Sequence, residues 1–210
     1  MKLNTSIYFV LLAFFVLCFG IISQGVLGTE TLLMNSLADI YTQEQLEETL
    51  AFQDKWQWVG YVAVPLLLLI KISVIALILD IGMFFFDKKI KYKQIFRAVV
   101  KAEFIFLLVI VVKTVWLYFL VPNYTLEDVQ YFYPLSALSV VGYKGMEAWF
   151  VYPLQTFNVF EIAYWCLLAF FIGKQLKENI GKSFTIVASS YGVALVIWII
   201  GVVFLTLHLS

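Results

Sequence analysis

Long apolar runs alternate with shorter polar segments along the whole chain. A helix needs about 20 mostly apolar residues to cross the hydrocarbon core of a bilayer, and runs of about this length occur five times. They cover residues 7–27, 58–86, 98–121, 154–173 and 183–207. The pattern therefore predicts an all-α polytopic membrane helix bundle with five transmembrane helices, formed by a single domain over residues 1–210.

The first apolar run also resembles a cleaved signal peptide. Lys2 supplies a positive charge before the run, and Val26-Leu27-Gly28 resembles a small-residue cleavage site. The apolar core of a signal peptide is only about 7–15 residues long, and this run is longer. We therefore expect it to be retained as the first membrane span.

Two polar segments, residues 28–57 and 122–153, are predicted to be partly helical outer loops. In the first, Thr42 followed by Gln45 fits a capping box, which predicts the start of a helix. Trp56 and Trp58 then mark the boundary of the second span, because amphipathic rings favour the headgroup level. We expect a short, separate interfacial helix here.

The second outer loop carries a weaker helix start, formed by Thr125 with Asp128. Aromatic–proline clusters occur at residues 131–134 and 149–153, and the stretch between them at 135–141 is apolar but too short to cross a membrane. It is predicted to be a re-entrant or interfacial element. The clusters fit either an aromatic belt or the mouth of a ligand site.

Composition supports lipid as the solvent of this chain. Hydrophobic residues make up 63% of it and charged residues 13%, and the mean hydropathy is +0.94, whereas soluble domains have about 45–50% apolar and about 25% charged residues. A soluble domain of this size could not hide so much apolar surface. A soluble enzyme, a nucleic-acid binder and a secreted disulfide scaffold are therefore excluded, and the lipid bilayer is the first partner.

The distribution of lysine and arginine predicts the orientation. With the N-terminus in the cytoplasm, the cytoplasmic segments hold nine basic residues: Lys2, Lys88, Lys89, Lys91, Lys93, Arg97, Lys174, Lys177 and Lys182. The outer segments hold only Lys55 and Lys144. By the positive-inside rule, we expect an integral protein of the cell (inner) membrane with a cytoplasmic N-terminus and an external C-terminus.

The cytoplasmic basic loop has two interpretations. Its charges, Lys88, Lys89, Lys91, Lys93 and Arg97, alternate with apolar residues. They fit an anchor on anionic lipid, where each charge contributes about 1 kcal/mol, or a docking site for a cytosolic partner. Nothing in the loop predicts nucleic-acid binding.

Ionisable side chains inside the apolar runs are the candidate site. Each costs roughly 2.5–3.5 kcal/mol at the centre of a span, so such groups must pair or face the bundle. Lys113 and Glu161 lie at similar depths, so we predict that they form a buried pair, with Asn158 one turn from Glu161. Lys71 either joins this pair or faces Glu103. Such a cluster either fixes helix register or serves as a relay or substrate contact.

Other candidate chemistry is sparse. His208 is the only histidine, and Cys18 and Cys166 form no C-x-x-C motif, so haem, catalytic zinc and thiol redox chemistry lack their ligands. We therefore predict no catalytic residue, no metal and no cofactor. In the last span, Ala188 and Gly192 form a small-xxx-small pair that favours close helix packing.

Some local patterns resemble a known family. Phe157-Asn158-Val159-Phe160-Glu161-Ile162-Ala163-Tyr164-Trp165, the helix start at residues 91–97 and Ser190-Tyr191-Gly192 are similar to bacterial members of the Yip family of five-span membrane proteins. The resemblance covers about residues 60–205 and implies five spans with an internal N-terminus. It implies no catalytic residue. The large N-terminal region through which eukaryotic relatives are associated with small GTPases is not matched here.

The sequence alone favours a non-enzymatic accessory or scaffold subunit of a larger membrane assembly for export or transport. Such a subunit would act through helix contacts with a membrane-protein partner or as a homo-oligomer. The alternative is a small transporter or channel that uses Lys71, Lys113 and Glu161. An intramembrane enzyme is the third and least favoured hypothesis.

Overall fold

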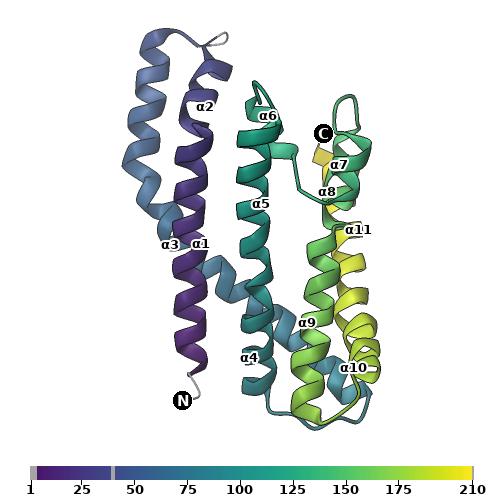
Figure 1. The fold of residues 1–210 in the computed structure, drawn as a ribbon. Coiled ribbons are helices and arrows are strands. Elements are labelled where there is room, and N and C mark those ends of the chain that lie inside the picture. The colour runs from purple at the N-terminus through teal and green to yellow at the C-terminus, as the bar shows by residue number, and fades with distance from the viewer. Residues whose placement is uncertain (1–3, 39–40, 210) are drawn as a thin grey trace.

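All regular secondary structure in the described part of the chain is helical. The computed structural model describes residues 4–38 and 41–209. One isolated antiparallel bridge, between Ser136 and Asn158, is the only β-type pairing within these ranges. The helices stand side by side, and the first and last described residues lie toward opposite ends of the bundle (Figure 1). The predicted all-α helix bundle is confirmed.

Four helical segments among the described residues are long and apolar enough to cross a membrane. They are α1 (Thr5–Leu27), α3 (Gln43–Phe85), α9 (Val159–Leu176) and the run Ile180–Leu209, which consists of α10 (Ile180–Val187), the π-helical turn η1 (Ala188–Gly192) and α11 (Val193–Leu209). These four segments contain most of the first, second, fourth and fifth predicted runs. The fourth run, predicted to begin at residue 154, begins as a span only at Val159.

The third predicted run does not form a single helix. It is divided at Phe104 into α4 (Tyr92–Glu103) and α5 (Ile105–Leu120). Phe104 has φ −58° and ψ −22°, which are typical of a 3₁₀ turn. This tighter turn separates the two helices, and the chain then continues in nearly the same direction. Figure 1 shows α4 and α5 end to end in the middle of the bundle.

Helix α3 is longer than the sequence predicts. The capping box of Thr42 and Gln45 is confirmed at its start. The prediction of a separate interfacial helix is wrong, because the helix continues for 43 residues into the second span and contains Pro65. At 1.5 Å per residue it is about 64 Å long, roughly twice the hydrocarbon thickness of a bilayer. It crosses diagonally behind α5 and α9 (Figure 1).

Both long connections contain helices, as predicted. The first contains α2 (Thr29–Leu37), and the second contains α6 (Leu126–Tyr131), α7 (Ala137–Val141) and α8 (Ala148–Thr156). The Thr125–Asp128 capping box opens α6. Within the short apolar stretch at 135–141, residues 137–141 form the single turn of α7.

The packed core lies where α3, α4, α9 and α10 meet. Its fully buried side chains include Ile72, Leu79, Ile95, Leu168 and Ile172. All of them lie in the half of the bundle that contains the basic connections. The outer half of α3 adds no buried residue to this core.

Two glycines permit the closest helix contacts in this core. A Cβ atom at Gly82 would lie 2.5 Å from Ser190 Cβ, and one at Gly192 would lie 2.6 Å from the Trp165 ring. Helix α3 therefore packs directly against η1, and the Trp165 ring of α9 packs against Gly192. The sequence predicted close helix packing from Ala188 and Gly192 together; the structure places Gly192 against the Trp165 ring, and the sequence analysis did not identify Gly82.

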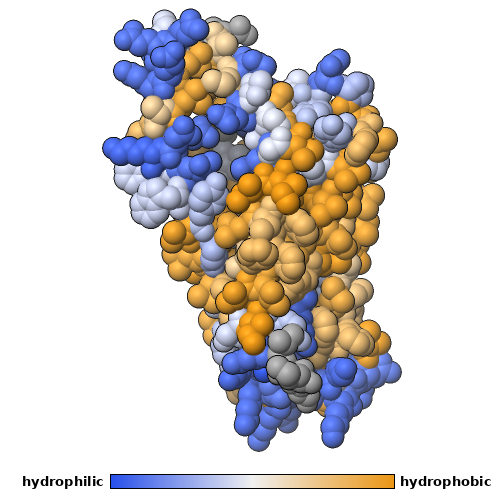
Figure 2. All heavy atoms as spheres, turned by 60° about the vertical axis from the view of Figure 1, so that its left-hand side comes forward, coloured by the Kyte–Doolittle hydropathy of each residue, from blue (hydrophilic) through white to orange (hydrophobic). Residues whose placement is uncertain are grey.

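The surface has an apolar band with hydrophilic ends (Figure 2). Large apolar side chains are exposed along α1, α3, α5 and α11. The basic connections between α3 and α4 and between α9 and α10 lie at the end where α1 begins (Figure 1). Lys2, which the positive-inside count places in the cytoplasm, lies outside the described residues. This surface and these long apolar helices are those of a membrane protein.

The contact at Gly82 provides a test of this packing. We expect Gly82→Ala to destabilise the protein by about 1–3 kcal/mol, because the new methyl group overpacks against Ser190. Gly60→Ala is the matched control in the same helix, since nothing lies within 4 Å of that position. Thermal unfolding in detergent should give a lower Tm for Gly82→Ala only, and Ser190→Gly should restore part of it. Equal Tm values for the two alanine variants would contradict the contact.

Candidate functional site

Polar side chains from several helices converge on one cleft with a volume of about 490 Å³. Its apolar walls come from α1, α3 and α5, for example Leu12, Leu68 and Ile110. Its polar groups come from α3, α4, α8, α9, η1 and the loop before α7. The cleft volume falls within the ~300–1,000 Å³ typical of small-molecule sites.

Lys71 and Glu103 form an ion pair at the edge of this cleft. Lys71 Nζ lies 2.9 Å from Glu103 Oε2, and the Tyr164 hydroxyl donates to Glu103 Oε1 at 2.9 Å. The Glu103 side chain is 1% exposed and that of Lys71 is 47% exposed. Lys71 Nζ also lies 4.4 Å from the centroid of the Phe106 ring. The carboxylate is thus enclosed, while the ammonium faces the cleft.

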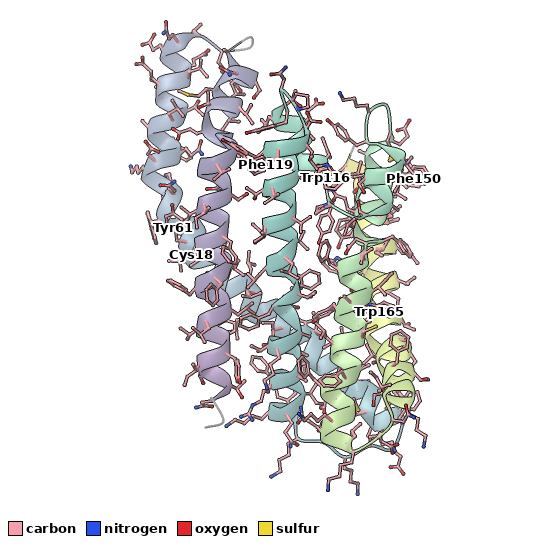
Figure 3. All side chains as sticks on the ribbon, in the orientation of Figure 1. Cys18, Tyr61, Trp116, Phe119, Phe150 and Trp165 are labelled. Atoms are coloured by element: carbon pink, nitrogen blue, oxygen red, sulfur yellow. The ribbon has the colours of Figure 1, made fainter. Side chains whose placement is uncertain are left out.

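Glu161 is held by neutral donors. Its Oε1 accepts hydrogen bonds from the Tyr191 hydroxyl at 2.8 Å and from Trp165 Nε1 at 2.9 Å. Figure 3 shows Trp165 on α9, next to the C-terminal helices. Glu161 Oε2 has no hydrogen bond from any described residue. Every fully buried side-chain polar atom in the described part of the chain has a partner, so Oε2 is open to the cleft.

The predicted Lys113–Glu161 pair is wrong. Lys113 makes no ion pair with any residue that the structure describes, and it does not line the cleft. The prediction matched depth along two helices by counting residues, and counting says nothing about rotation around each helix axis. The alternative that Lys71 faces Glu103 is the arrangement observed.

Asn158 also differs from the prediction. It lies one turn before Glu161, as predicted, but it is the N-cap of α9 rather than a residue within a span that begins at 154, and its Oδ1 accepts the Glu161 N–H at 2.7 Å. Its Nδ2 donates to the carbonyls of Gln155 and Thr156. The backbone of Asn158 is extended and pairs with Ser136 in the isolated bridge. The cap fixes the position of Glu161 at the start of α9.

Irregular backbone occurs beside each carboxylate. The 3₁₀ turn at Phe104 follows Glu103, and the π turn η1 carries Tyr191, which binds Glu161. Single π turns inside α-helices occur frequently at functional sites. In membrane proteins, non-helical backbone is tolerated where it is buried in protein or lines a cavity. The cleft provides such a surrounding.

Two tyrosines complete the outer edge of the cleft. Tyr133 belongs to the loop before α7, and its hydroxyl has no hydrogen-bond partner among the described residues. Burial, together with the negative charges of Glu161 and Glu103, raises the pKa of Tyr133 to about 12, so the hydroxyl is protonated at neutral pH. The hydroxyl of Tyr152 accepts from Trp198 Nε1 at 2.9 Å and keeps its own proton to donate.

The remaining predicted residues lie away from the cleft. In the basic loop, Lys88 binds Glu178 at 2.6 Å, and the Arg97 side chain donates to Thr5 at 2.8 Å. The hydrogen bond and charge of Lys88 lower the pKa of Glu178, as does the charge of Lys182. The other three basic residues are exposed, namely Lys89, Lys91 and Lys93. Ala188 begins η1 and is half-buried.

Sequence reasoning missed the aromatic partners of both glutamates. The four-residue spacing of Glu161 and Trp165 places them one helical turn apart, so this contact had a local signal. The contact of Tyr164 with Glu103 spans 61 positions and had none. The cluster at 131–134, predicted as a belt or a ligand mouth, contributes Tyr133 to the cleft.

The cleft carries a net negative charge when its groups have their ordinary ionisation. One ammonium, Lys71, faces two carboxylates, Glu103 and Glu161, and it is paired with the first. The second carboxylate, Glu161, accepts hydrogen bonds only from the Tyr191 hydroxyl and the Trp165 indole among the described residues. Such an arrangement can bind a cation or a proton, and it offers no nucleophile with an adjacent base.

No protein-family model, no curated protein and no solved structure matches this chain. The resemblance to the Yip family therefore stays a prediction from the sequence.

The ion pair can be tested by removing its exposed partner. We expect Lys71→Met to insert normally and to lose about 1.5–3 kcal/mol of stability, the usual contribution of a hydrogen bond to a charged group. Lys71→Met with Glu103→Gln should recover part of this loss, because no buried carboxylate is left unpaired. Lys113→Met is the matched control and should keep its Tm in detergent. A Tm for Lys71→Met equal to that of the control would show that the pair contributes nothing.

Proposed function

We propose that this chain is a five-crossing membrane protein that binds a small solute in the cleft and moves it across the bilayer, as a small transporter or channel. The observation that carries the proposal is the convergence of Lys71, Glu103 and Glu161, from three separate helices, on one accessible cleft. Charges that serve packing alone have no need of an accessible volume between them.

The energetic cost of these groups supports the same proposal. An ionisable residue within a span costs roughly 2.5–3.5 kcal/mol, and such residues typically mark solute or ion pathways. Glu161 has no cationic partner within ion-pair distance among the described residues. Discontinuous helices lining a site are also typical of transporters, and α4–α5, α8–α9 and α10–α11 are all interrupted beside the cleft.

The five crossings of this proposal are α1, α3, the pair α4–α5, α9 and the run from α10 to α11. Residues 92–120 of the third crossing would extend over about 40 Å at helical rise, which exceeds the hydrocarbon thickness. The N-terminus is proposed to face the cytoplasm, together with the basic connections. Five crossings are few for a transporter, so a homo-oligomer is part of the proposal.

An accessory subunit is the second candidate, favoured by the outer half of α3. Trp56, Trp58 and Val62 on this half are 48%, 59% and 60% exposed, and Tyr61 lies at the edge of the bundle (Figure 3). A second membrane protein packed along this face would cover these side chains. Purification in mild detergent with a stoichiometric partner would favour this candidate.

The proposed topology predicts that the two ends lie in different compartments. In a bacterial host, a fluorescent protein fused to the N-terminus should fluoresce, because it folds in the cytoplasm. Alkaline phosphatase fused to the C-terminus should be active, because it needs the oxidising outer compartment. Exchanging the two reporters is the control and should silence both. Activity of the same reporter at both ends would contradict an odd number of crossings.

The transport function predicts ion or proton flux by the pure protein. Liposomes containing the protein and a trapped pH dye should dissipate an imposed proton or salt gradient faster than empty liposomes. Glu161→Gln should reduce the flux to the background, because it removes the free charge of the cleft. Lys113→Met should keep the flux, since this residue lies outside the cleft. Background flux from correctly folded wild-type protein under each gradient would count against a transporter.

A further inference from the structure

We infer that the cleft takes hydrophobic organic cations, with Glu161 as the counter-charge and the rings of Tyr133, Tyr152 and Tyr191 as the cation-binding faces. This inference rests on the proposed function, because it names the solute class of the same cleft. It follows from the charge, the lining and the position of the cleft.

The charge of the cleft selects a cation. Lys71 is neutralised by Glu103 at 2.9 Å, which leaves the Glu161 carboxylate as the free charge. Only its Oε1 is engaged, by Tyr191 and Trp165, and Oε2 is open. At an effective dielectric of about 20, a cation 4 Å from this oxygen would gain a substantial Coulomb attraction.

The lining selects a cation with an apolar body. The walls are aliphatic side chains of α1, α3, α5 and α11, and the three tyrosines line the same space. The faces of tyrosine rings attract cations through the ring quadrupole, most strongly where water is excluded. A small hydrated metal ion would gain nothing from aliphatic walls, since they cannot replace its water ligands. A bulky ammonium or phosphonium ion gains from both surfaces.

The position of the cleft gives such a cation a route from the lipid. Helix α3 packs against η1 near Gly82 and then diverges from α11 toward the opposite end of the bundle (Figure 1). The cleft lies in this angle, because it is lined by Leu68 of α3 and Leu195 of α11. A hydrophobic cation that partitions into the apolar layer would therefore approach the cleft from the side.

Tetraphenylphosphonium and tetraphenylborate test this inference, because they have nearly the same size and shape and opposite charge. Equilibrium dialysis against the purified full-length chain in detergent, with empty micelles as the blank, should show saturable binding of tetraphenylphosphonium. Tetraphenylborate should show no saturable binding. Equal binding of both ions would overturn the inference, since apolar burial alone would then explain it.

Three variants locate the charge. Glu161→Gln keeps an acceptor for Tyr191 and Trp165 and should weaken tetraphenylphosphonium binding by about tenfold or more. Glu161→Asp should retain saturable binding. Glu147→Gln removes a carboxylate outside the cleft and should change nothing. Unchanged binding by folded Glu161→Gln would overturn the inference.

A ring variant keeps the test decisive if Glu161→Gln does not fold. Tyr133→Leu, in a loop, should weaken tetraphenylphosphonium binding by roughly three- to tenfold through loss of one cation–π face. Tyr131→Leu, two positions earlier and outside the cleft, is the control and should bind normally. Equal affinities of these two variants would overturn the role of the ring.

Binding and flux separate this inference from the proposed function. Dialysis requires no transport, so saturable tetraphenylphosphonium binding without flux of protons, salt or tetraphenylphosphonium itself into liposomes would refute the transporter and support the binding site. Ion or proton flux without tetraphenylphosphonium binding would refute the solute class and leave the transporter standing.

Discussion

The enclosure of the Glu103 carboxylate constrains the arrangement of the helices around it. An ionised group removed from water must be held by a counter-charge or by hydrogen-bond donors, or its cost exceeds any gain from packing. Here α3 supplies Lys71 and α9 supplies Tyr164, so three helices must keep their register for the carboxylate to be satisfied. A rotation of α3 that moved Lys71 away would bury an unpaired charge. Apolar packing alone tolerates such slips far better, because dispersion contacts are not directional.

The same requirement explains why the helices are irregular near the cleft. A regular α-helix spaces its side chains at fixed angles, and two carboxylates on different helices cannot both meet all of their donors without local adjustment. The π turn Ala188–Gly192 changes the phase of the C-terminal helix and directs Tyr191 to Glu161, and the Asn158 cap starts α9 where Glu161 can reach it. These deviations need internal partners for the freed backbone groups.

Local signals in the sequence predicted much of the fold and less of the site. Apolar run lengths gave the positions of α1, α3, α9 and the C-terminal run, and residue spacing gave the caps at Thr42 and Thr125. The 3₁₀ turn at Phe104 was not predictable, since no glycine or proline marks it. The pairing of Lys71 with Glu103 was left open and that of Lys113 with Glu161 was wrong, because both depend on rotations that only tertiary packing determines. The hydrogen bonds of Tyr164 to Glu103 and of Tyr191 to Glu161 could not be predicted for the same reason.

The uneven distribution of packing explains why a cleft persists in such a small bundle. Close contacts at Gly82 with Ser190 and at Gly192 with Trp165 fix the crossing of α3 near one end, where the buried core is concentrated. Beyond that crossing α3 diverges from α11 (Figure 1), and its outer half adds no buried residue to the core. Filling the resulting angle with aliphatic side chains would leave Glu161 without room for a solute. The tyrosines of η1, α8 and the loop before α7 line it together with aliphatic side chains, so the cleft opens directly beside the close contacts that pack η1.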